Sequence, residues 1–286
     1  MRCLILPVLF AAARIAFAQA HDADPPGPCG ELVTIAGHSG TTMRYAYTEA
    51  RVAAASGERI ALVMLVGGGG VIELDDMGCP QRLNRNSLLR MSPLLREAGV
   101  ATVLVDAPSD QRGEDGLGGF RSAAGHADDL GRVIAEVRAR SRGAVWIVGH
   151  SRGTISAANA AARLTGPSAP DGLVLMSSMM VGNPKAKKYW VAQTVFSVDL
   201  AAIKAPLLLI GHAADSCLRS PAHLMAGIAA KAGSARQQLA KVTGGPAIVG
   251  RPPSVEACEV GEAHDFVDQE AEIAAGILRF MGGGRY

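Results

Sequence analysis

Short runs of consecutive apolar residues recur along the chain and predict the strands of a sheet. Five of them span residues 59–67, 100–108, 144–150, 172–178 and 205–212. Unbroken apolar runs of this length are typical of parallel strands that are covered on both faces. Two shorter runs, at 31–37 and 42–50, lie close together and predict an antiparallel hairpin. A last strand is expected near 236–244.

Longer segments with apolar residues at helical spacing separate these runs. They predict helices over 85–99, 122–141, 155–166 and 220–233, and a final helix from Phe266 to Met281. A hairpin followed by alternating strands and helices predicts an α/β protein, with a mostly parallel eight-stranded sheet and helices on both faces. No repeat or long linker divides it, so residues 21–286 are expected to form one domain, with 181–200 as at most a short cap.

The first twenty residues have the pattern of an export signal. Arg2 supplies the positive start, an apolar run follows, and Ala18-Gln19-Ala20 is a small-x-small cleavage site, although Arg14 departs from the pattern. Export to the periplasm or the medium is therefore expected. No other run reaches the roughly 18 uninterrupted apolar residues of a spanning helix, so no stable membrane insertion is expected.

The charge balance and the motifs of the chain restrict the classes of partner and cofactor that are expected. Removal of Arg2 and Arg14 with the signal leaves 26 basic residues against 26 acidic ones. This balance argues against nucleic acid and anionic membrane surfaces. No phosphate-loop or dinucleotide motif is found, so no cofactor is expected. The oligomeric state stays open.

Four cysteines remain after removal of the signal. They are Cys29, Cys79, Cys217 and Cys258. An even number in an exported protein predicts two disulfides, with three possible pairings. The absence of a C-x-x-C motif gives little support to a zinc or redox site, and no metal is expected.

The stretch VGHSRGT, residues 148–154, sets Ser151 directly after a predicted buried strand and directly before a predicted helix. A serine between glycines decides little in a chain with 34 glycines. This strand–turn–helix setting, however, is the one that a nucleophilic serine on a strained turn requires. Gly149 and Gly153 would let strand and helix pass closely. The N–H groups at the helix start, beginning with Arg152, would point toward an anion forming on an attacked carbonyl.

On these residues the chain resembles the α/β-hydrolase fold family, and the resemblance covers nearly all of residues 21–286. In that family the nucleophile follows the fifth strand, as Ser151 does here. The family's loop after the third strand supplies oxyanion donors. In this chain that loop is Gly67–Gly70, which is similar to the HGGG-type motif but lacks its histidine. Gly68 or Gly69 is the expected donor beside the nucleophile turn.

The resemblance also implies an acid after the seventh strand and a histidine before the last helix. APLLLIGHAADSC places Asp215 at the first position and GEAHDF places His264 at the second, in the family's order. A serine hydroxyl is too weakly acidic to attack a carbonyl alone. His264 would accept its proton and Asp215 would orient the imidazole. Asp199, after the sixth predicted strand, is the alternative acid.

The implied site favours one of the three cysteine pairings. Cys217 lies two residues after the implied acid and Cys258 six before the implied base, so a bond between them would tie the two loops together. Cys29 and Cys79 would then form the other disulfide, and it would anchor the N-terminal part of the chain beside the site.

His150, Tyr189 and Trp190 are the candidate substrate contacts. His150 precedes the nucleophile on its turn, where a lining or packing role is expected rather than proton transfer. Tyr189 and Trp190 belong to the segment 181–200, in a chain with only 4% aromatic residues. Whether the side chain of Arg152 reaches into the cleft or into solvent stays open.

The sequence thus predicts a serine hydrolase that cleaves a small-molecule carboxylic ester through an acyl-enzyme intermediate. The fold alone does not select the substrate. A periplasmic serine peptidase or amidase is the first alternative, because it would use the same three residues. A non-catalytic binding protein that kept the fold is the second.

Overall fold

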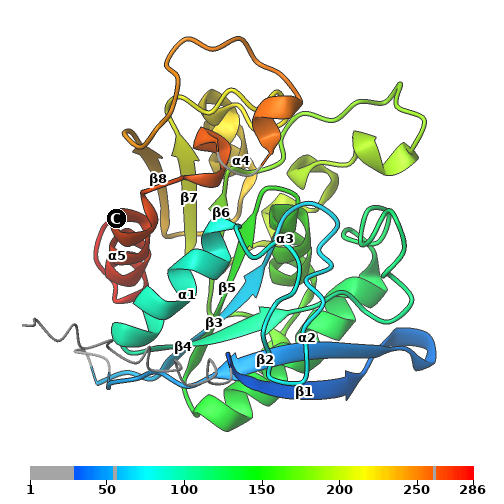
Figure 1. Cartoon of the computed structure of the whole chain (residues 1–286). Coiled ribbons are helices and arrows are strands. Elements are labelled where there is room, and N and C mark those ends of the chain that lie inside the picture. The colour runs from blue at the N-terminus through cyan, green and yellow to red at the C-terminus, as the bar shows by residue number, and fades with distance from the viewer. Residues whose placement is uncertain (1–28, 54–56, 260–261) are drawn as a thin grey trace, which may run out of the picture.

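The computed structural model describes residues 29–53, 57–259 and 262–286, so the expected export signal at 1–20 lies outside the described residues. Its centre is one open eight-stranded sheet with the order β1-β2-β4-β3-β5-β6-β7-β8 (Figure 1). β1 (Glu31–Ala36) and β2 (Thr42–Thr48) form the expected antiparallel hairpin, and β2 joins β4 in antiparallel register.

The six remaining strands run parallel. They are β3 (Ile60–Leu65), β4 (Val100–Val105), β5 (Ala144–His150), β6 (Gly172–Met176), β7 (Leu207–His212) and β8 (Gln237–Val242). Every residue of β3, β4, β6 and β7 is buried, which explains their unbroken apolar runs. β8 forms an edge of the sheet and is largely exposed, so its sequence signal is weaker.

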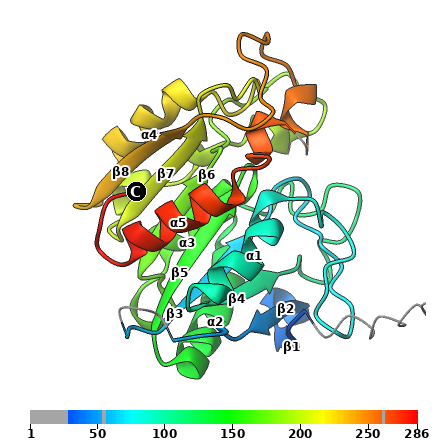
Figure 2. The ribbon, with the colours of Figure 1, turned by 60° about the vertical axis from the view of Figure 1, so that its left-hand side comes forward.

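Helices cover both faces of the sheet. α1 (Ser87–Glu97) and α5 (Glu270–Met281) lie side by side on one face (Figure 2). α2 (Ala124–Ser141), α3 (Gly153–Arg163) and α4 (Met225–Lys231) pack on the other. Short 3-10 turns fill the connections: η1 (His38–Gly40), η2 (Gly166–Ser168), η3 (Tyr189–Ala192), η4 (Val195–Ser197), η5 (Leu200–Ala202), η6 (Ala222–Leu224), η7 (Glu256–Cys258) and η8 (Ala263–Asp265).

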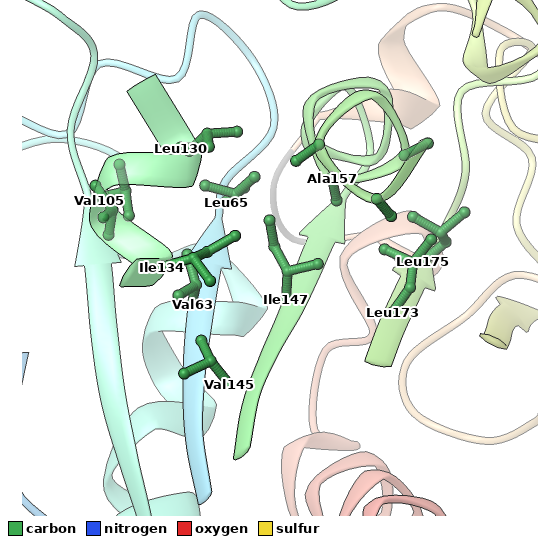
Figure 3. Close-up of a cluster of buried hydrophobic side chains, with 14 of the residues drawn as sticks. Val63, Leu65, Val105, Leu130, Ile134, Val145, Ile147, Ala157, Leu173 and Leu175 are labelled. Carbon is green, nitrogen blue, oxygen red and sulfur yellow. The ribbon is translucent and has the colours of Figure 1, made fainter. Parts of the chain in front are cut away.

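Alternate residues of each central strand serve the two faces. Val63 and Ile147 point toward α2 and α3 (Figure 3), whereas Leu62 and Val148 belong to the core beneath α1 and α5. All four are fully buried. Because burial of one such side chain contributes about 1.5–3 kcal/mol, these two layers hold the sheet that positions the site.

The final helix begins later than its apolar spacing predicts. α5 starts at Glu270 and not at Phe266. Phe266 and Asp268 have φ values of 50° and 61°, in the left-handed region that a helix cannot include. The Phe266 side chain is nevertheless fully buried, so its apolar character reflects core packing of a loop rather than a helical turn.

The cysteines pair as the implied site predicts. Cys29 is bonded to Cys79, and Cys217 to Cys258. The first bond fastens the turn at 77–79 to the start of β1, where Cys29 N–H also donates to the Met77 carbonyl. Among the described residues, no helix is long and apolar enough to cross a bilayer.

Candidate active site

Ser151 stands on a sharp turn between β5 and α3. Its φ is 52°, a strained value for a residue with a side chain. A Cβ on Gly149 would come 2.4 Å from the Gly153 carbonyl oxygen, and one on Gly153 would come 2.1 Å from the Leu65 oxygen. Both contacts are to backbone and cannot yield. The glycines on either side of Ser151 are therefore required by the close passage of strand and helix, as their sequence pattern predicts.

The structure brings Ser151, His264 and Asp215 together. His264 Nε2 lies 2.9 Å from Ser151 Oγ, and His264 Nδ1 lies 3.0 Å from Asp215 Oδ2. The side chains of His264 and Asp215 are each about 1% exposed. An imidazole between a hydroxyl and a buried carboxylate can take a proton from the first while the second stabilises the resulting charge.

Two buried side chains hold the backbone of His264 by hydrogen bonds. In η8 its carbonyl oxygen accepts hydrogen bonds from His150 Nε2 at 3.0 Å and from Ser177 Oγ at 2.8 Å. His150 Nδ1 in turn accepts from Asn86 Nδ2 at 3.0 Å, and Asn86 Oδ1 caps the start of α1. The histidine loop is thus attached to the ends of β5 and β6 and to α1.

Ser220 joins the acid to the base, and nothing in the sequence distinguishes it from other loop serines. Its Oγ lies 2.9 Å from Asp215 Oδ2 and 2.8 Å from His264 Nδ1, and it is 1% exposed. Asp215 Oδ1 accepts from the Cys217 N–H at 2.8 Å. Both oxygens of the carboxylate therefore have donors, which fixes its orientation toward the imidazole.

The glycine run after β3 lies directly against the nucleophile. A Cβ on Gly67 would come 2.9 Å from Ser151 Cβ. Gly68 has a φ of 54°, which glycine adopts without strain. Among the described residues, the N–H groups of Gly68 and Arg152 donate to no backbone carbonyl. Gly69 lies farther along, where its carbonyl accepts from the Leu117 N–H at 2.8 Å.

A small cavity of about 90 Å³ opens at Ser151. It is lined by Gly67, Gly68, Leu83, Cys258 and His264, among others. Gly69 is not part of this lining. Of the two glycines, it is therefore Gly68 that lies at this cavity.

His150 packs within the site. It is 2% exposed, both ring nitrogens are engaged by protein groups, and burial lowers its pKa. His150 also lines the cavity at Ser151, so both the lining and the packing role fit its position, and contact with substrate stays a prediction.

Tyr189 and Trp190 are the first two residues of η3. The guanidinium carbon of Arg152 lies 4.0 Å from the centre of the Trp190 ring, so the Arg152 side chain stacks on an aromatic face instead of extending freely into solvent. Burial, with help from the charge of Arg219, lowers the pKa of Arg152 to about 10. Tyr189 is 72% exposed. Contact of these aromatic residues with substrate stays a prediction.

The described residues bear on two further points: which acid faces His264, and whether the residues around it could bind a metal. Asp199 precedes η5 and forms no hydrogen bond with His264, whereas Asp215 does. Asp215, Cys217 and His264 offer ligand atoms within 4.8 Å of one another. Cys217, however, is bonded to Cys258, so its sulfur is not a thiolate that could bind a metal.

Arg121 is a further buried residue near the nucleophile that the sequence did not single out. It lies between β4 and α2, is 1% exposed, and reaches the glycine run after β3. An arginine in a polar loop gives no sign in the sequence that it will be buried.

Comparison with known proteins shows likeness in structure alone. No protein-family model matches the chain, and no curated protein matches it in sequence. Esterase 2 of Thermogutta terrifontis is similar with a TM-score of 0.58 at 16% identity, over 92% of this chain and 98% of that one. A cold-adapted esterase from an Arctic intertidal metagenomic library has a TM-score of 0.56 at 16% identity, over 89% and 93%.

A third solved structure is described as an α/β serine hydrolase without a lid, from Xanthomonas campestris. Its TM-score is 0.52 at 18% identity, over 90% of this chain and 95% of that one. In all three cases the likeness extends over at least 89% of this chain. This chain adopts the α/β-hydrolase fold, as the resemblance in its sequence predicts.

Proposed function

We propose that this protein is a serine hydrolase that cleaves carboxylic esters through an acyl-enzyme intermediate. One observation carries the proposal: the unbroken hydrogen-bonded line from Ser151 Oγ to His264 Nε2 at 2.9 Å, and from His264 Nδ1 to Asp215 Oδ2 at 3.0 Å. Nucleophile, base and orienting acid stand at hydrogen-bonding distance and in the order that the reaction requires.

In the first half of the reaction, Ser151 Oγ attacks the carbonyl carbon of the ester while His264 Nε2 takes the serine proton. The carbonyl oxygen becomes an oxyanion in the tetrahedral intermediate. His264 then returns the proton to the leaving alcohol, the carbon–oxygen bond breaks, and the acyl group remains on Ser151. In the second half, water replaces the alcohol in the reverse sequence of steps and frees the serine.

The N–H groups of Arg152 and Gly68 are the proposed donors to the oxyanion. Both lack a backbone acceptor in the described part of the chain, and both belong to segments next to Ser151. Each such donor contributes about 3 kcal/mol to the transition state. Gly68 is preferred to Gly69 because, of these two glycines, Gly68 alone lines the cavity at Ser151.

Ester hydrolysis is preferred to peptide or amide hydrolysis because two of the similar solved structures are described as esterases. The two disulfides support the proposed export, since they persist in an oxidising compartment. A small-molecule substrate fits the confined cavity at Ser151.

Replacement of the nucleophile tests the proposal. The mature protein is expected to hydrolyse p-nitrophenyl acetate, and Ser151→Ala to lose at least about a thousandfold in kcat. The assay follows release of p-nitrophenolate by its visible absorbance. A parallel assay with a p-nitroanilide separates ester from amide hydrolysis.

The chain offers a matched control in Ser39→Ala. Ser39, in GHSGT, also follows a histidine and also has a positive φ, but it is exposed at the hairpin turn. Its replacement is expected to leave kcat unchanged. Retained hydrolysis in Ser151→Ala would contradict the proposal.

A further inference from the structure

Arg121 is a fully buried cation without an acidic partner. Among the described residues it forms no salt bridge, and burial lowers its pKa to about 9, with a smaller effect from the nearby charge of Arg152. A buried unpaired cation costs free energy unless hydrogen bonds compensate for the lost water. An apolar side chain would fill the same space at lower cost, so the contacts of this arginine need an explanation.

The hydrogen bonds of Arg121 go to the glycine run beside the nucleophile. Nη2 lies 3.3 Å from the carbonyl oxygen of Val66, 3.4 Å from that of Gly67 and 3.1 Å from that of Gly68. Nη1 donates to Ser156 Oγ at 2.9 Å. Three successive carbonyl groups of one loop therefore face a single guanidinium.

This arrangement determines where the opposite ends of those peptide groups point. The carbonyl of Gly67 and the N–H of Gly68 belong to one planar trans peptide and point in opposite directions. Because the Gly67 carbonyl is turned toward Arg121, the Gly68 N–H is turned away from it. Gly67 and Gly68 both line the cavity at Ser151.

The glycine run needs such an external restraint. Four consecutive glycines have more backbone freedom than any other tetrapeptide, and Gly68 and Gly70 have φ values of 54° and 74°. A Cβ on Gly70 would come 2.8 Å from Arg121 Nη2. The loop is thus free of side chains where the guanidinium approaches it. The Gly67 carbonyl also accepts from the Gly70 N–H at 3.0 Å, and the guanidinium adds a restraint from outside the loop.

Helix α3 holds the arginine in place. Ser156 accepts from its guanidinium, and Asn159 Nδ2 donates to the carbonyl oxygens of Arg121 at 3.1 Å and Ala123 at 2.8 Å. The same helix begins at the turn that carries Ser151. The nucleophile and the glycine loop therefore share one support, with Arg121 between them.

We propose that Arg121 is a positioning residue that sets the orientation of the Gly67–Gly68 peptide, so that the Gly68 N–H can donate to the oxyanion. The inference rests on the proposed function, because this donor matters only when Ser151 forms a tetrahedral adduct. It goes beyond that function by assigning a role to a residue that touches neither substrate nor nucleophile.

The test uses Arg121→Lys and Arg121→Gln in the full mature protein. Lys keeps a cation and Gln keeps two N–H donors, but neither has the planar guanidinium that binds the loop carbonyls and Ser156 together. With p-nitrophenyl acetate, kcat is expected to fall about a hundredfold, while KM changes less than about threefold. Affinity for phenylboronic acid, which forms a tetrahedral adduct with the serine, is expected to fall in step with kcat.

A purely structural role would give a different pattern. Arg132→Gln, on the exposed side of α2, serves as the control and is expected to keep the wild-type kcat. Wild-type kcat in a folded Arg121 variant overturns the inference. So do parallel changes in kcat and KM that follow a lowered Tm, and failure of both variants to fold. Absence of Ser151-dependent hydrolysis in the wild type is the separate failure of the proposed function.

Discussion

Ser151 and Ser39 show what a short motif can and cannot predict. Both follow a Gly-His pair, and their φ values are 52° and 48°. His38, beside Ser39, is bound to Asp129 at 2.7 Å and Asp110 at 3.1 Å and supports a hairpin turn. Of these two serines, only Ser151 has an imidazole at its hydroxyl, that of His264. A reactive serine is therefore defined by the distant loop that reaches it, not by its neighbours in sequence.

Ser220→Ala is expected to lower kcat about ten- to a hundredfold with little change in KM. The Ser220 hydroxyl stands between Asp215 Oδ2 and His264 Nδ1, so its removal takes a hydrogen-bond donor from the carboxylate and leaves the imidazole less firmly oriented. Steady-state kinetics with p-nitrophenyl acetate would measure the effect, together with the pH profile of kcat.

Ser216→Ala is the matched control, because Ser216 lies in the same loop and only its backbone carbonyl takes part in a recorded hydrogen bond within the described ranges. Wild-type kcat and pH profile are expected there. A Ser220→Ala variant that was equally unaffected would show that Asp215 orients the base without help.

Among the connecting elements, the loops that carry Asp215 and His264 are tied together at several points. Cys217 is bonded to Cys258, and the backbone of Ser254 exchanges hydrogen bonds with Ser216 and Leu218, both at 2.9 Å. Between β8 and η7 the chain makes the long excursion in orange at the top of Figure 1. It returns to the acid loop before the chain reaches the histidine.

The two disulfides allow a matched comparison. They close loops of similar length, with sequence separations of 50 and 41 residues, so loss of either is expected to lower the free energy of unfolding by about 4 kcal/mol. Only Cys217→Ala with Cys258→Ala is expected to lower kcat as well, because only that bond joins the acid and base loops.

Chemical unfolding and kinetics on both double variants would separate the two effects. Equal kcat values in the Cys29→Ala, Cys79→Ala variant and the Cys217→Ala, Cys258→Ala variant would mean that backbone hydrogen bonds alone hold the two loops in register.

The regular elements were predictable because their sequence pattern follows from burial. Fully apolar strands, such as Ile60–Leu65, are covered on both faces, and the helices between them bury one stripe. The start of α5 was not predictable in this way. Phe266 is apolar because a loop carries it into the core, and apolar spacing alone cannot distinguish this from a helical turn.

The site was predictable only as far as the backbone restricts residue choice. Gly149 and Gly153 are required by close backbone contacts, and their spacing around Ser151 indicated the proposed nucleophile. Asp215 and His264 followed from the resemblance in chain order. Ser220, Asn86 and Arg121 act through contacts between segments far apart in the sequence, and no local rule requires a serine, asparagine or arginine at those positions.

At the scale of the whole molecule, buried histidines make stability depend on pH. His126 is 2% exposed, has no hydrogen-bond partner for either nitrogen among the described residues, and lies near the charges of Arg121 and His38. Burial and these charges lower its pKa to about 3. The folded protein keeps this ring neutral at a pH at which the unfolded chain takes up a proton.

The free energy of unfolding is therefore expected to be highest above about pH 6.5 and to fall as the pH drops below it, by roughly 1 kcal/mol per pH unit from this residue. His126→Gln is expected to reduce that slope below about pH 6.5, the ordinary pKa of a histidine. Urea unfolding at several pH values would measure it.

The exposed His223, in η6, provides the control, since His223→Gln is expected to leave the slope as in the wild type. An unchanged slope in His126→Gln would show that His126 is protonated equally in the folded and unfolded states.

The stretch between β6 and β7 has a practical consequence for engineering. Residues 181–200 contain only short 3-10 turns, and of their side chains only Thr194, Val195 and Leu200 are buried. Exchange of the remaining positions other than Trp190, whose ring stacks on the Arg152 side chain beside the serine, would leave the serine, the base and their supports untouched, because these are fastened to strand ends and to α1 and α3. Replacing this stretch with segments of other sequence is thus the natural route to altered substrate selectivity with kcat preserved.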